Sequence, residues 1–216
     1  MKNYLEHKLQ YTTDGRLIDE RGHAVMMDWE KEWMHESAKI ICEAGGDILN
    51  IGFGMGIIDS FIETYPINSH TIIEAHPDVY SKMIEDGWDK KPNVKIIFGK
   101  WQDIINDLPK FDGIYFDTWE DDGFYEIFLP HLKNILKENG VFSYWEGISF
   151  QIVNSATTDI LYKEFEFDKK ILTLNNIPSK QEQYESGKGF YFNPNWNQCV
   201  IPIIRYRRNK IVKTII

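Results

Sequence analysis

The chain has 216 residues, of which 43% are hydrophobic and 26% are charged, a balance typical of a globular protein. The formal net charge of −9 at pH 7 argues against nucleic acid as a partner, since phosphate backbones are bound by basic surfaces. No signal-peptide pattern or apolar run of membrane length appears, so we expect a cytoplasmic protein without a membrane partner. Cys42 and Cys199 lie far apart in apolar stretches and are expected to be reduced core residues.

The first 26 residues are polar and predict no regular structure. Residues 28–43 then show the helical spacing of apolar side chains, and the pair Gly45 and Gly46 ends that pattern. No internal repeat or low-complexity linker interrupts the chain, so we expect residues 1–216 to form a single domain.

A glycine-rich turn follows the first predicted strand. Residues 48–51 form a short, mainly apolar run, Gly52, Gly54 and Gly56 come next, and apolar residues recur at helical spacing from Ile57. This pattern indicates a buried parallel strand, a tight turn and a helix N-terminus. Glycine lets a ligand approach the backbone closely, although the same glycines can simply join a strand to a helix.

A second strand, residues 71–74, ends in a carboxylate. Glu74 follows Gly54 at a separation of 20 residues, where an acid meets a ribose hydroxyl in nucleotide-binding βαβ units. The dinucleotide pattern G-x-G-x-x-G fails because Ile57 stands in its third glycine position, which makes a dehydrogenase the least favoured reading. No Lys or Arg stands at the start of the following helix to bind a pyrophosphate, so the loop looks more like one that binds S-adenosylmethionine.

The rest of the chain alternates between predicted strands and helices. Further strands are expected at residues 94–98, 111–117, 141–145, 167–174 and 198–206. Further helices are expected at residues 57–64, 78–87, 124–137 and 148–164, with Asn139-Gly140 as a helix stop. The polar stretch 175–197 is too long for a simple connection and predicts a lid or a partner-specific loop.

These alternations predict an α/β fold with a doubly wound, Rossmann-like sheet of seven strands and helices on both faces. No clear helix separates the last two strands, so a terminal hairpin would make the last strand antiparallel. Sheets of this kind bind their ligands beyond the carboxyl ends of the strands.

Five segments in this order resemble a known family: MDWEKEWMH (27–35), LNIGFGMGI (49–57), IEAHP (73–77), GKWQD (99–103) and FDGIYFDT (111–118). They are similar to guanidinoacetate N-methyltransferases, and more so to the fungal-type arginine methyltransferases that modify the internal (delta) guanidino nitrogen. The resemblance implies a class I methyltransferase fold. It also implies S-adenosyl-L-methionine as the methyl donor and S-adenosyl-L-homocysteine as the product.

The resemblance also implies where the cofactor binds. Gly52 to Met55 would line its methionine part, Glu74 its ribose, and Trp101 with Gln102 its adenine. Residues 1–45 would form a lid of N-terminal helix over a Rossmann-like core of residues 46–216. The full set of implied cofactor-binding residues is Trp29, Met34, Gly52, Phe53, Gly54, Met55, Glu74, Ala75, His76, Gly99, Trp101, Gln102 and Asp117.

A guanidinium is a poor nucleophile because it stays protonated, with a pKa above ~12. Carboxylates at neighbouring strand ends can orient the planar group and take up a proton. Asp117 matches the family's guanidinium-binding aspartate and is predicted to be catalytic; the alternative is a turn or cap residue. Glu146, after the next strand, is predicted to be the second catalytic carboxylate, with a solvated loop residue as the alternative.

The expected substrate is a small cationic guanidino compound. Guanidinoacetate methyltransferases carry a Glu at the place of Asn50. The absence of that carboxylate in this chain favours free arginine over guanidinoacetate as the substrate. Methylation of a protein arginine and a non-catalytic binding module remain alternatives. Histidine and cysteine spacing predicts no metal site. The predicted substrate-binding residues are Trp29, Glu30, Trp33, Asn50, Asp117, Thr118 and Glu146.

Overall fold

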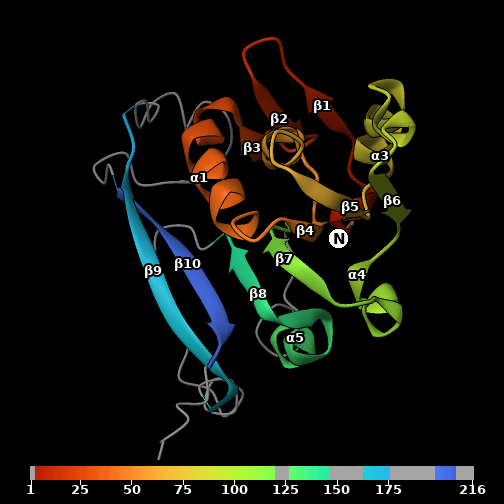
Figure 1. The fold of residues 1–216 in the computed structure, drawn as a ribbon. Coiled ribbons are helices and arrows are strands. Elements are labelled where there is room, and N and C mark those ends of the chain that lie inside the picture. Colours follow the sequence, from red (N-terminus) through yellow and green to blue (C-terminus); the bar gives the residue numbers. More distant parts are fainter. Residues whose placement is uncertain (1–2, 120–126, 146–162, 176–197, 208–216) are drawn as a thin grey trace, which may run out of the picture.

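The computed structural model describes residues 3–119, 127–145, 163–175 and 198–207. Its centre is a seven-stranded sheet with the spatial order β6-β5-β4-β7-β8-β10-β9 (Figure 1). The first five strands in this order pair in parallel, whereas β10 is antiparallel to both of its neighbours, β8 and β9. The strands are β4 (Gly46–Ile51), β5 (Ile67–Glu74), β6 (Val94–Phe98), β7 (Phe111–Phe116), β8 (Leu136–Tyr144), β9 (Phe165–Thr173) and β10 (Gln198–Tyr206). This confirms the predicted sheet and its antiparallel last strand.

The helices cover both faces of the sheet, as predicted. α1 (Lys31–Ile41), α2 (Ile57–Ile62), α3 (Pro77–Glu85) and the 3₁₀ helix η3 (Trp88–Lys90) pack on one face. α4 (Trp101–Ile104), η4 (Ile105–Asp107) and α5 (Leu129–Ile135) pack on the other (Figure 1).

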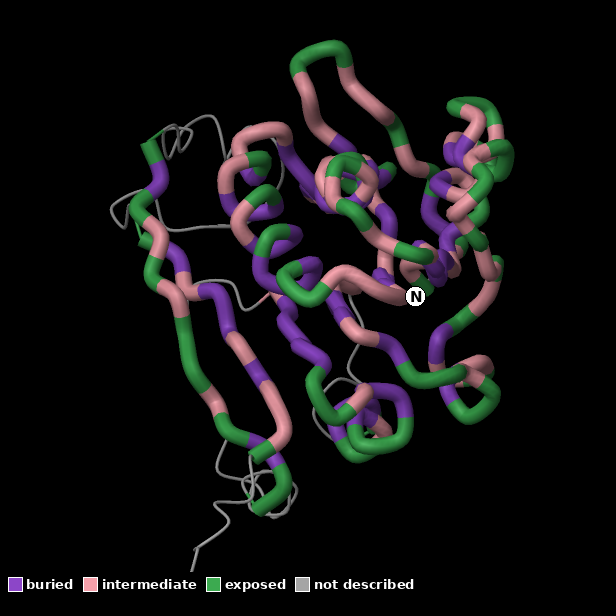
Figure 2. The backbone as a smooth tube through the Cα atoms, in the orientation of Figure 1, coloured by how far each residue is buried: buried purple, intermediate pink, exposed green. Residues whose placement is uncertain are grey.

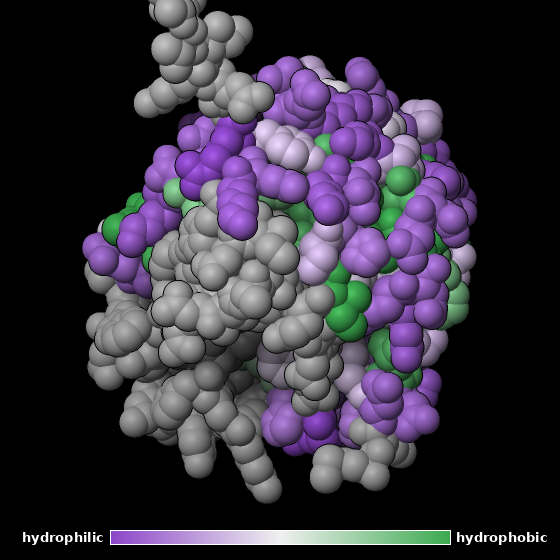
Figure 3. Space-filling view, turned by 90° about the horizontal axis from the view of Figure 1, so that it is seen from below, coloured by the Kyte–Doolittle hydropathy of each residue, from purple (hydrophilic) through white to green (hydrophobic). Residues whose placement is uncertain are grey.

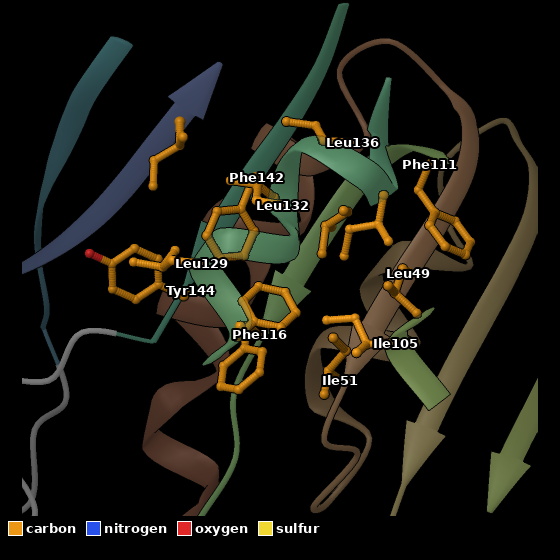
Figure 4. Packing of buried hydrophobic residues seen from close by; sticks show 14 of the residues in the cluster. Leu49, Ile51, Ile105, Phe111, Phe116, Leu129, Leu132, Leu136, Phe142 and Tyr144 are labelled. Carbon is orange, nitrogen blue, oxygen red and sulfur yellow. The ribbon is translucent and has the colours of Figure 1, made fainter. Parts of the chain in front are cut away.

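The central strands are buried on both faces, so their sequences read as continuous apolar runs. In β4, Leu49 and Ile51 point to the face of α5, where Phe116 and Leu132 also gather (Figure 4). Ile48, which precedes Leu49 and so points to the opposite face of the pleat, joins the core on the face of α1 and α2. The tube view shows the same pattern, with buried residues concentrated in the centre and exposed residues along the edge strand β9 (Figure 2).

The expectation of an irregular N-terminus is wrong. The short helix η1 (Tyr4–Glu6) leads into an antiparallel sheet of β1 (Leu9–Tyr11), β2 (Arg16–Asp19) and β3 (Ala24–Met27). The strands have only three or four residues, too few to give a clear alternation of apolar and polar side chains. The turns use Gly15 and Gly22, both at φ 81°. The 3₁₀ helix η2 (Asp28–Glu30) then joins β3 to α1.

The predicted helix stop at Asn139-Gly140 is also wrong. Within the described residues α5 ends at Ile135, and β8 begins directly at Leu136. The pairing of β7 with β8 jumps from Phe111 opposite Leu136 to Gly113 opposite Val141. The residues of the predicted stop therefore lie in a bulge of the strand. Most of the predicted helix 148–164 and of the loop 175–197 lies outside the described residues.

The surface that the structure describes is largely hydrophilic on the face seen in Figure 3. Phe98, Ile127 and Ile171 are its exposed large hydrophobic side chains. Cys42 and Cys199 are buried free thiols, as expected, and burial raises the pKa of each to about 12. Within the described ranges, no helix combines the length and apolar character that crossing a bilayer requires.

Candidate active site

A cavity lies beyond the carboxyl ends of the parallel strands, where the fold predicts a ligand site. It is lined by most of the predicted glycine loop, by both predicted strand-end acids of the described residues, and by the segment after β6. The lining residues are Asn3, Tyr4, Leu5, Val25, Met26, Ile51, Gly52, Phe53, Gly54, Ile58, Ile73, Glu74, Ala75, Val79, Gly99, Lys100, Trp101, Gln102, Asp117, Thr118, Trp119 and Trp145.

The glycine turn between β4 and α2 forms the floor of the cavity. Gly52 has φ +92°, and a Cβ atom added there would lie 1.8 Å from the backbone oxygen of Asp117. Gly54 has φ +56°, and an added Cβ atom would lie 2.9 Å from the sulfur of Met26. Both positions therefore need glycine, because the turn packs directly against the end of β7 and against β3.

Glu74, the last residue of β5, is a nearly buried carboxylate at the cavity wall. Its Oε2 accepts a hydrogen bond from the backbone N–H of Phe53 (2.8 Å), and its Oε1 accepts one from that of His76 (2.6 Å). Burial raises the pKa of Glu74, and these backbone donors oppose the rise. Backbone donors of two turns thus hold the carboxylate rigidly as a hydrogen-bond acceptor.

Asp117 follows β7 and lies beside the glycine turn, where its backbone N–H donates to the Ile51 oxygen (2.9 Å). The residue is half-buried and lines the cavity, and no described residue forms an ion pair with its carboxylate. Loss of hydration, with a smaller contribution from the charge of Asp59, raises the pKa of Asp117 to about 7.

The N-terminal residues contribute a wall whose individual residues the sequence analysis did not name. Asn3, Tyr4 and Leu5 of the first turn and Val25 and Met26 of β3 all line the cavity. Contacts to the main fold hold this wall: the Tyr11 hydroxyl donates to the Gly54 oxygen (2.9 Å), and the Leu9 N–H donates to Asp78 (3.0 Å). The family resemblance implied a lid of residues 1–45, but the short strands gave no pattern that would name these lining residues.

Several predicted residues lie behind the cavity rather than in its lining. Trp33 is fully buried and stacks on Trp145, with ring centroids 5.4 Å apart. Glu30 is fully buried and accepts hydrogen bonds from the Met27 N–H (2.8 Å) and from Trp145 Nε1 (3.2 Å). Both side chains therefore support Trp145, a cavity residue that the site prediction omitted although it ends a predicted strand.

Five further predicted site residues also lie outside the lining of the cavity. Met34, Asn50 and His76 are fully buried, and His76 accepts from the Asp78 N–H (3.1 Å) as the cap of α3. Trp29 Nε1 donates to the sulfur of Met27 (3.2 Å), and the Met55 N–H donates to that of Met26 (3.2 Å). Glu146 lies outside the described residues.

Sequence comparison gives the family. The family model described as "Guanidinoacetate N-methyltransferase" matches residues 2–186, which is most of the chain. The chain belongs to this family. In the described residues no group of three or more His, Cys, Asp or Glu side chains is arranged to hold a metal ion.

Two of the similar curated proteins are fungal arginine methyltransferases by name. "Protein arginine N-methyltransferase 2" of Candida glabrata is 37% identical over 208 residues, which are 88% of this chain and 50% of that protein. The Saccharomyces cerevisiae protein of the same name is 36% identical over 212 residues, or 89% of this chain and 50% of that protein. The chain therefore spans about half the length of these two relatives.

Solved structures share the fold of this chain. Spermidine synthase from Thermotoga maritima superposes with a TM-score of 0.61 at 12% identity, covering 96% of this chain and 71% of that one. The Podospora anserina methyltransferase PaMTH1, bound to S-adenosylhomocysteine, gives a TM-score of 0.52 at 16% identity, covering 83% and 78%. At these identities the likeness shows the Rossmann-like methyltransferase architecture alone.

Proposed function

We propose that the protein is an S-adenosylmethionine-dependent methyltransferase that modifies a guanidino nitrogen of a small molecule, with free arginine first and guanidinoacetate second. Membership of the family and the names of the fungal relatives support the reaction class. The observation that carries the substrate proposal is Asp117. Its carboxylate lies in the cavity wall without a cationic partner among the described residues, and a guanidinium supplies that partner.

The cavity fits a ribose-bearing cofactor without phosphates. Glu74 presents a fixed carboxylate that can accept hydrogen bonds from ribose hydroxyls, and Gly52 and Gly54 expose backbone instead of side chains. Trp101 and Gln102, after β6, line the same cavity where the family resemblance puts the adenine. When bound there, S-adenosylmethionine supplies an electrophilic methyl group.

Asp117 can orient the substrate and also receive its proton. A carboxylate accepts two parallel N–H bonds from a guanidinium, which fixes the plane of the group. A guanidinium nitrogen that gains a methyl group must lose a proton, and a carboxyl with a pKa of about 7 can take it at neutral pH. Thr118 lines the cavity beside it. Glu146 stays our predicted second carboxylate.

A transfer assay tests this proposal directly. The protein is incubated with methyl-labelled S-adenosylmethionine and, separately, with free arginine, guanidinoacetate or an arginine-containing peptide. We expect label on free arginine, with mass spectrometry assigning the methylated nitrogen. Calorimetry with S-adenosylhomocysteine serves as the control for an intact cofactor site. Cofactor binding without transfer to any guanidino compound would contradict the proposal.

The names of the relatives favour a second candidate, an arginine residue of a protein as the substrate. The peptide arm of the same assay separates the two candidates. Label on the peptide with none on free arginine would select protein methylation, whereas the opposite result would select the small molecule.

A further inference from the structure

His76 joins the main fold to the N-terminal segment, residues 3–8, through both nitrogens of its ring. The fully buried imidazole accepts a hydrogen bond at Nδ1 from the backbone N–H of Asp78 (3.1 Å), and its Nε2 lies 3.1 Å from the backbone oxygen of His7. A carbonyl oxygen only accepts, so Nε2 carries a proton, whereas Nδ1 accepts and carries none. One neutral tautomer therefore satisfies both bonds. Burial also lowers the pKa of His76, which favours the neutral ring.

The main chain of His76 holds the acid of the proposed cofactor site. Its backbone N–H donates to Oε1 of Glu74 (2.6 Å), the carboxylate at the cavity wall. Its ring contacts the ring of Tyr4, with centroids 5.0 Å apart, and Tyr4 lines the same cavity. His76 thus contacts both the acid and the N-terminal segment, although it does not line the cavity itself.

The N-terminal segment begins with a turn that is capped by its own side chains. Asn3 Oδ1 accepts from the Leu5 N–H (3.3 Å), and the Asn3 N–H donates to Oε2 of Glu6 (3.0 Å). Asn3, Tyr4 and Leu5 of this turn all line the cavity. Because the turn is held together locally, its docking against the main fold decides how closely this side of the cavity is walled.

Asp78, two residues after His76, also binds this part of the chain. Its Oδ2 accepts from the Leu9 N–H (3.0 Å), and its Oδ1 pairs with Lys8 Nζ (3.2 Å). The Lys8 side chain is 81% exposed, so water screens this ion pair and its contribution is small. The ring of His76 is buried, where a hydrogen bond is stronger and a donor left without its partner is costly.

We propose that His76 is a positioning residue of the cofactor site: its imidazole holds residues 3–8 against the ribose end of the cavity, and this wall slows the release of S-adenosylhomocysteine. The inference rests on the proposed function, because the cofactor must occupy this cavity for the wall to act on it. The family resemblance implied a direct contact between His76 and the cofactor. The geometry supports an action through Asn3, Tyr4 and Leu5 instead.

The small N-terminal sheet has further anchors that do not involve His76. The Tyr11 hydroxyl of β1 donates to the Gly54 oxygen (2.9 Å) at the glycine turn. The Met55 N–H donates to the Met26 sulfur (3.2 Å), which ties β3 to the same turn. Loss of the His76 contacts should therefore loosen the N-terminal segment while the sheet stays docked.

The test is the rate at which S-adenosylhomocysteine dissociates from the full chain, measured by surface plasmon resonance. His76→Asn is the test variant. Asn is a preferred N-cap residue whose side-chain oxygen can accept the Asp78 N–H, so the start of α3 is kept. Its shorter side chain loses the ring contact with Tyr4 and the bond to the His7 oxygen. Lys8→Met is the matched control, because it removes the exposed contact of the same segment.

We expect dissociation to be about 3- to 10-fold faster in His76→Asn, the factor that the loss of one buried hydrogen bond gives. The association rate should change by less than about twofold, and Lys8→Met should leave both rates near their wild-type values. Hydrogen exchange should become faster in residues 3–8 of His76→Asn. The Tyr80 amide of α3, which donates to the His76 backbone oxygen (2.9 Å), should stay protected.

An unchanged dissociation rate in folded His76→Asn would overturn the proposal. Faster dissociation that comes with lost protection in α3 would overturn it too, because it would limit His76 to capping that helix. If the variant does not fold, the wild type still decides. Nitrogen NMR shifts of the His76 ring should show a proton on Nε2 and none on Nδ1, and that proton should exchange more slowly with S-adenosylhomocysteine bound. The other tautomer, or exchange that ignores the ligand, would contradict the proposal.

These measurements need no methyl transfer, so the transfer assay can fail while the role of His76 holds. Wild-type protein that does not bind S-adenosylhomocysteine would overturn the proposed function and this inference together. Binding with unchanged rates in the variant would overturn this inference alone.

Discussion

Strand β7 carries an aspartate near each end, and the two have opposite environments. Near its start, Asp112 shares the Lys137 ammonium with Asp47 of β4, at 2.7 and 2.8 Å. Hydrogen bonding to Lys137 is the main cause that lowers the pKa of Asp47. Directly after the strand, Asp117 has no ion-pair partner among the described residues, and loss of hydration raises its pKa to about 7.

The difference separates an acid that stabilises the fold from an acid available to a ligand. At the amino edge of the sheet the charges satisfy one another, so this cluster needs nothing from outside the protein. At the carboxyl edge the protein removes water from a carboxylate without supplying a cation. A guanidinium would provide that cation, which is why we place the chemistry at this edge.

Replacing Asp117 by Asn should have the largest effect on activity. The variant keeps the shape of the side chain but can neither hold the guanidinium as an ion pair nor take its proton. We expect the rate of transfer to arginine to fall about 10²- to 10⁴-fold, while S-adenosylhomocysteine binding measured by calorimetry stays near the wild-type value. A variant with wild-type turnover would exclude Asp117 as the base.

The same variant should not lose stability at alkaline pH. A carboxyl whose folded pKa is raised above its unfolded value contributes stability at low pH, and that contribution disappears as the pH rises through about 7. Urea unfolding at pH 8 should therefore find Asp117→Asn at least as stable as the wild type. A marked loss of stability at pH 8 would indicate that Asp117 has a structural partner.

Substituting Gly52 by Ala should disrupt the glycine turn, which packs directly against Asp117. The new Cβ atom would lie 1.8 Å from the Asp117 oxygen in a backbone conformation with φ +92°. We expect a loss of about 2–3 kcal/mol in the free energy of unfolding. Gly22→Ala is the control, because Gly22 has φ +81° but no atom within 4 Å of an added Cβ; its loss should be about 1 kcal/mol. Equal losses would contradict the close approach.

Replacing Glu74 by Gln should weaken cofactor binding. The carboxylate is held by the Phe53 and His76 N–H groups, and an amide cannot accept the same set of hydrogen bonds. We expect roughly 10- to 100-fold weaker binding of S-adenosylhomocysteine, measured by calorimetry. Unchanged affinity would show that the ribose does not reach Glu74.

Lys137→Met should have the smallest effect and should act on stability only. The cluster is partly exposed, so we expect a loss of less than about 1 kcal/mol in the free energy of unfolding at pH 7 and low salt. The pKa of Asp47 is lowered in the folded state, so the contribution of the pair is present above the unfolded pKa and disappears as the pH falls through the folded one. Altered methyl transfer in this variant would contradict the division between stabilising acids at the amino edge of the sheet and a ligand-binding acid at its carboxyl edge.

The core of the site could be predicted because a small number of local rules determine its position. A glycine turn after a buried strand and an acid after the next strand must meet at the same edge of a parallel sheet. Gly52, Glu74 and Asp117 therefore came together as expected.

The second layer of the site was not predictable in the same way, because it depends on contacts between distant segments. The family resemblance places Trp33 at the substrate, yet its side chain is fully buried and stacks on Trp145, which follows β8. Asn50 was predicted to bind substrate from the family resemblance, but its side chain is fully buried and donates to Asp59. Residues 3–5 line the cavity through docking of the small N-terminal sheet, which no periodic pattern announces.

The most direct test of the account is the pH dependence of arginine binding to the protein loaded with S-adenosylhomocysteine. If Asp117 is the unpaired acid that receives the guanidinium, affinity should rise by nearly tenfold per pH unit below about pH 7 and level off above it. Calorimetry in buffers of different ionisation enthalpy should show a proton released on binding at pH 6, and Asp117→Asn should abolish this release. Arginine affinity that is independent of pH between about 5.5 and 8.5, or equal in the variant, would contradict the account.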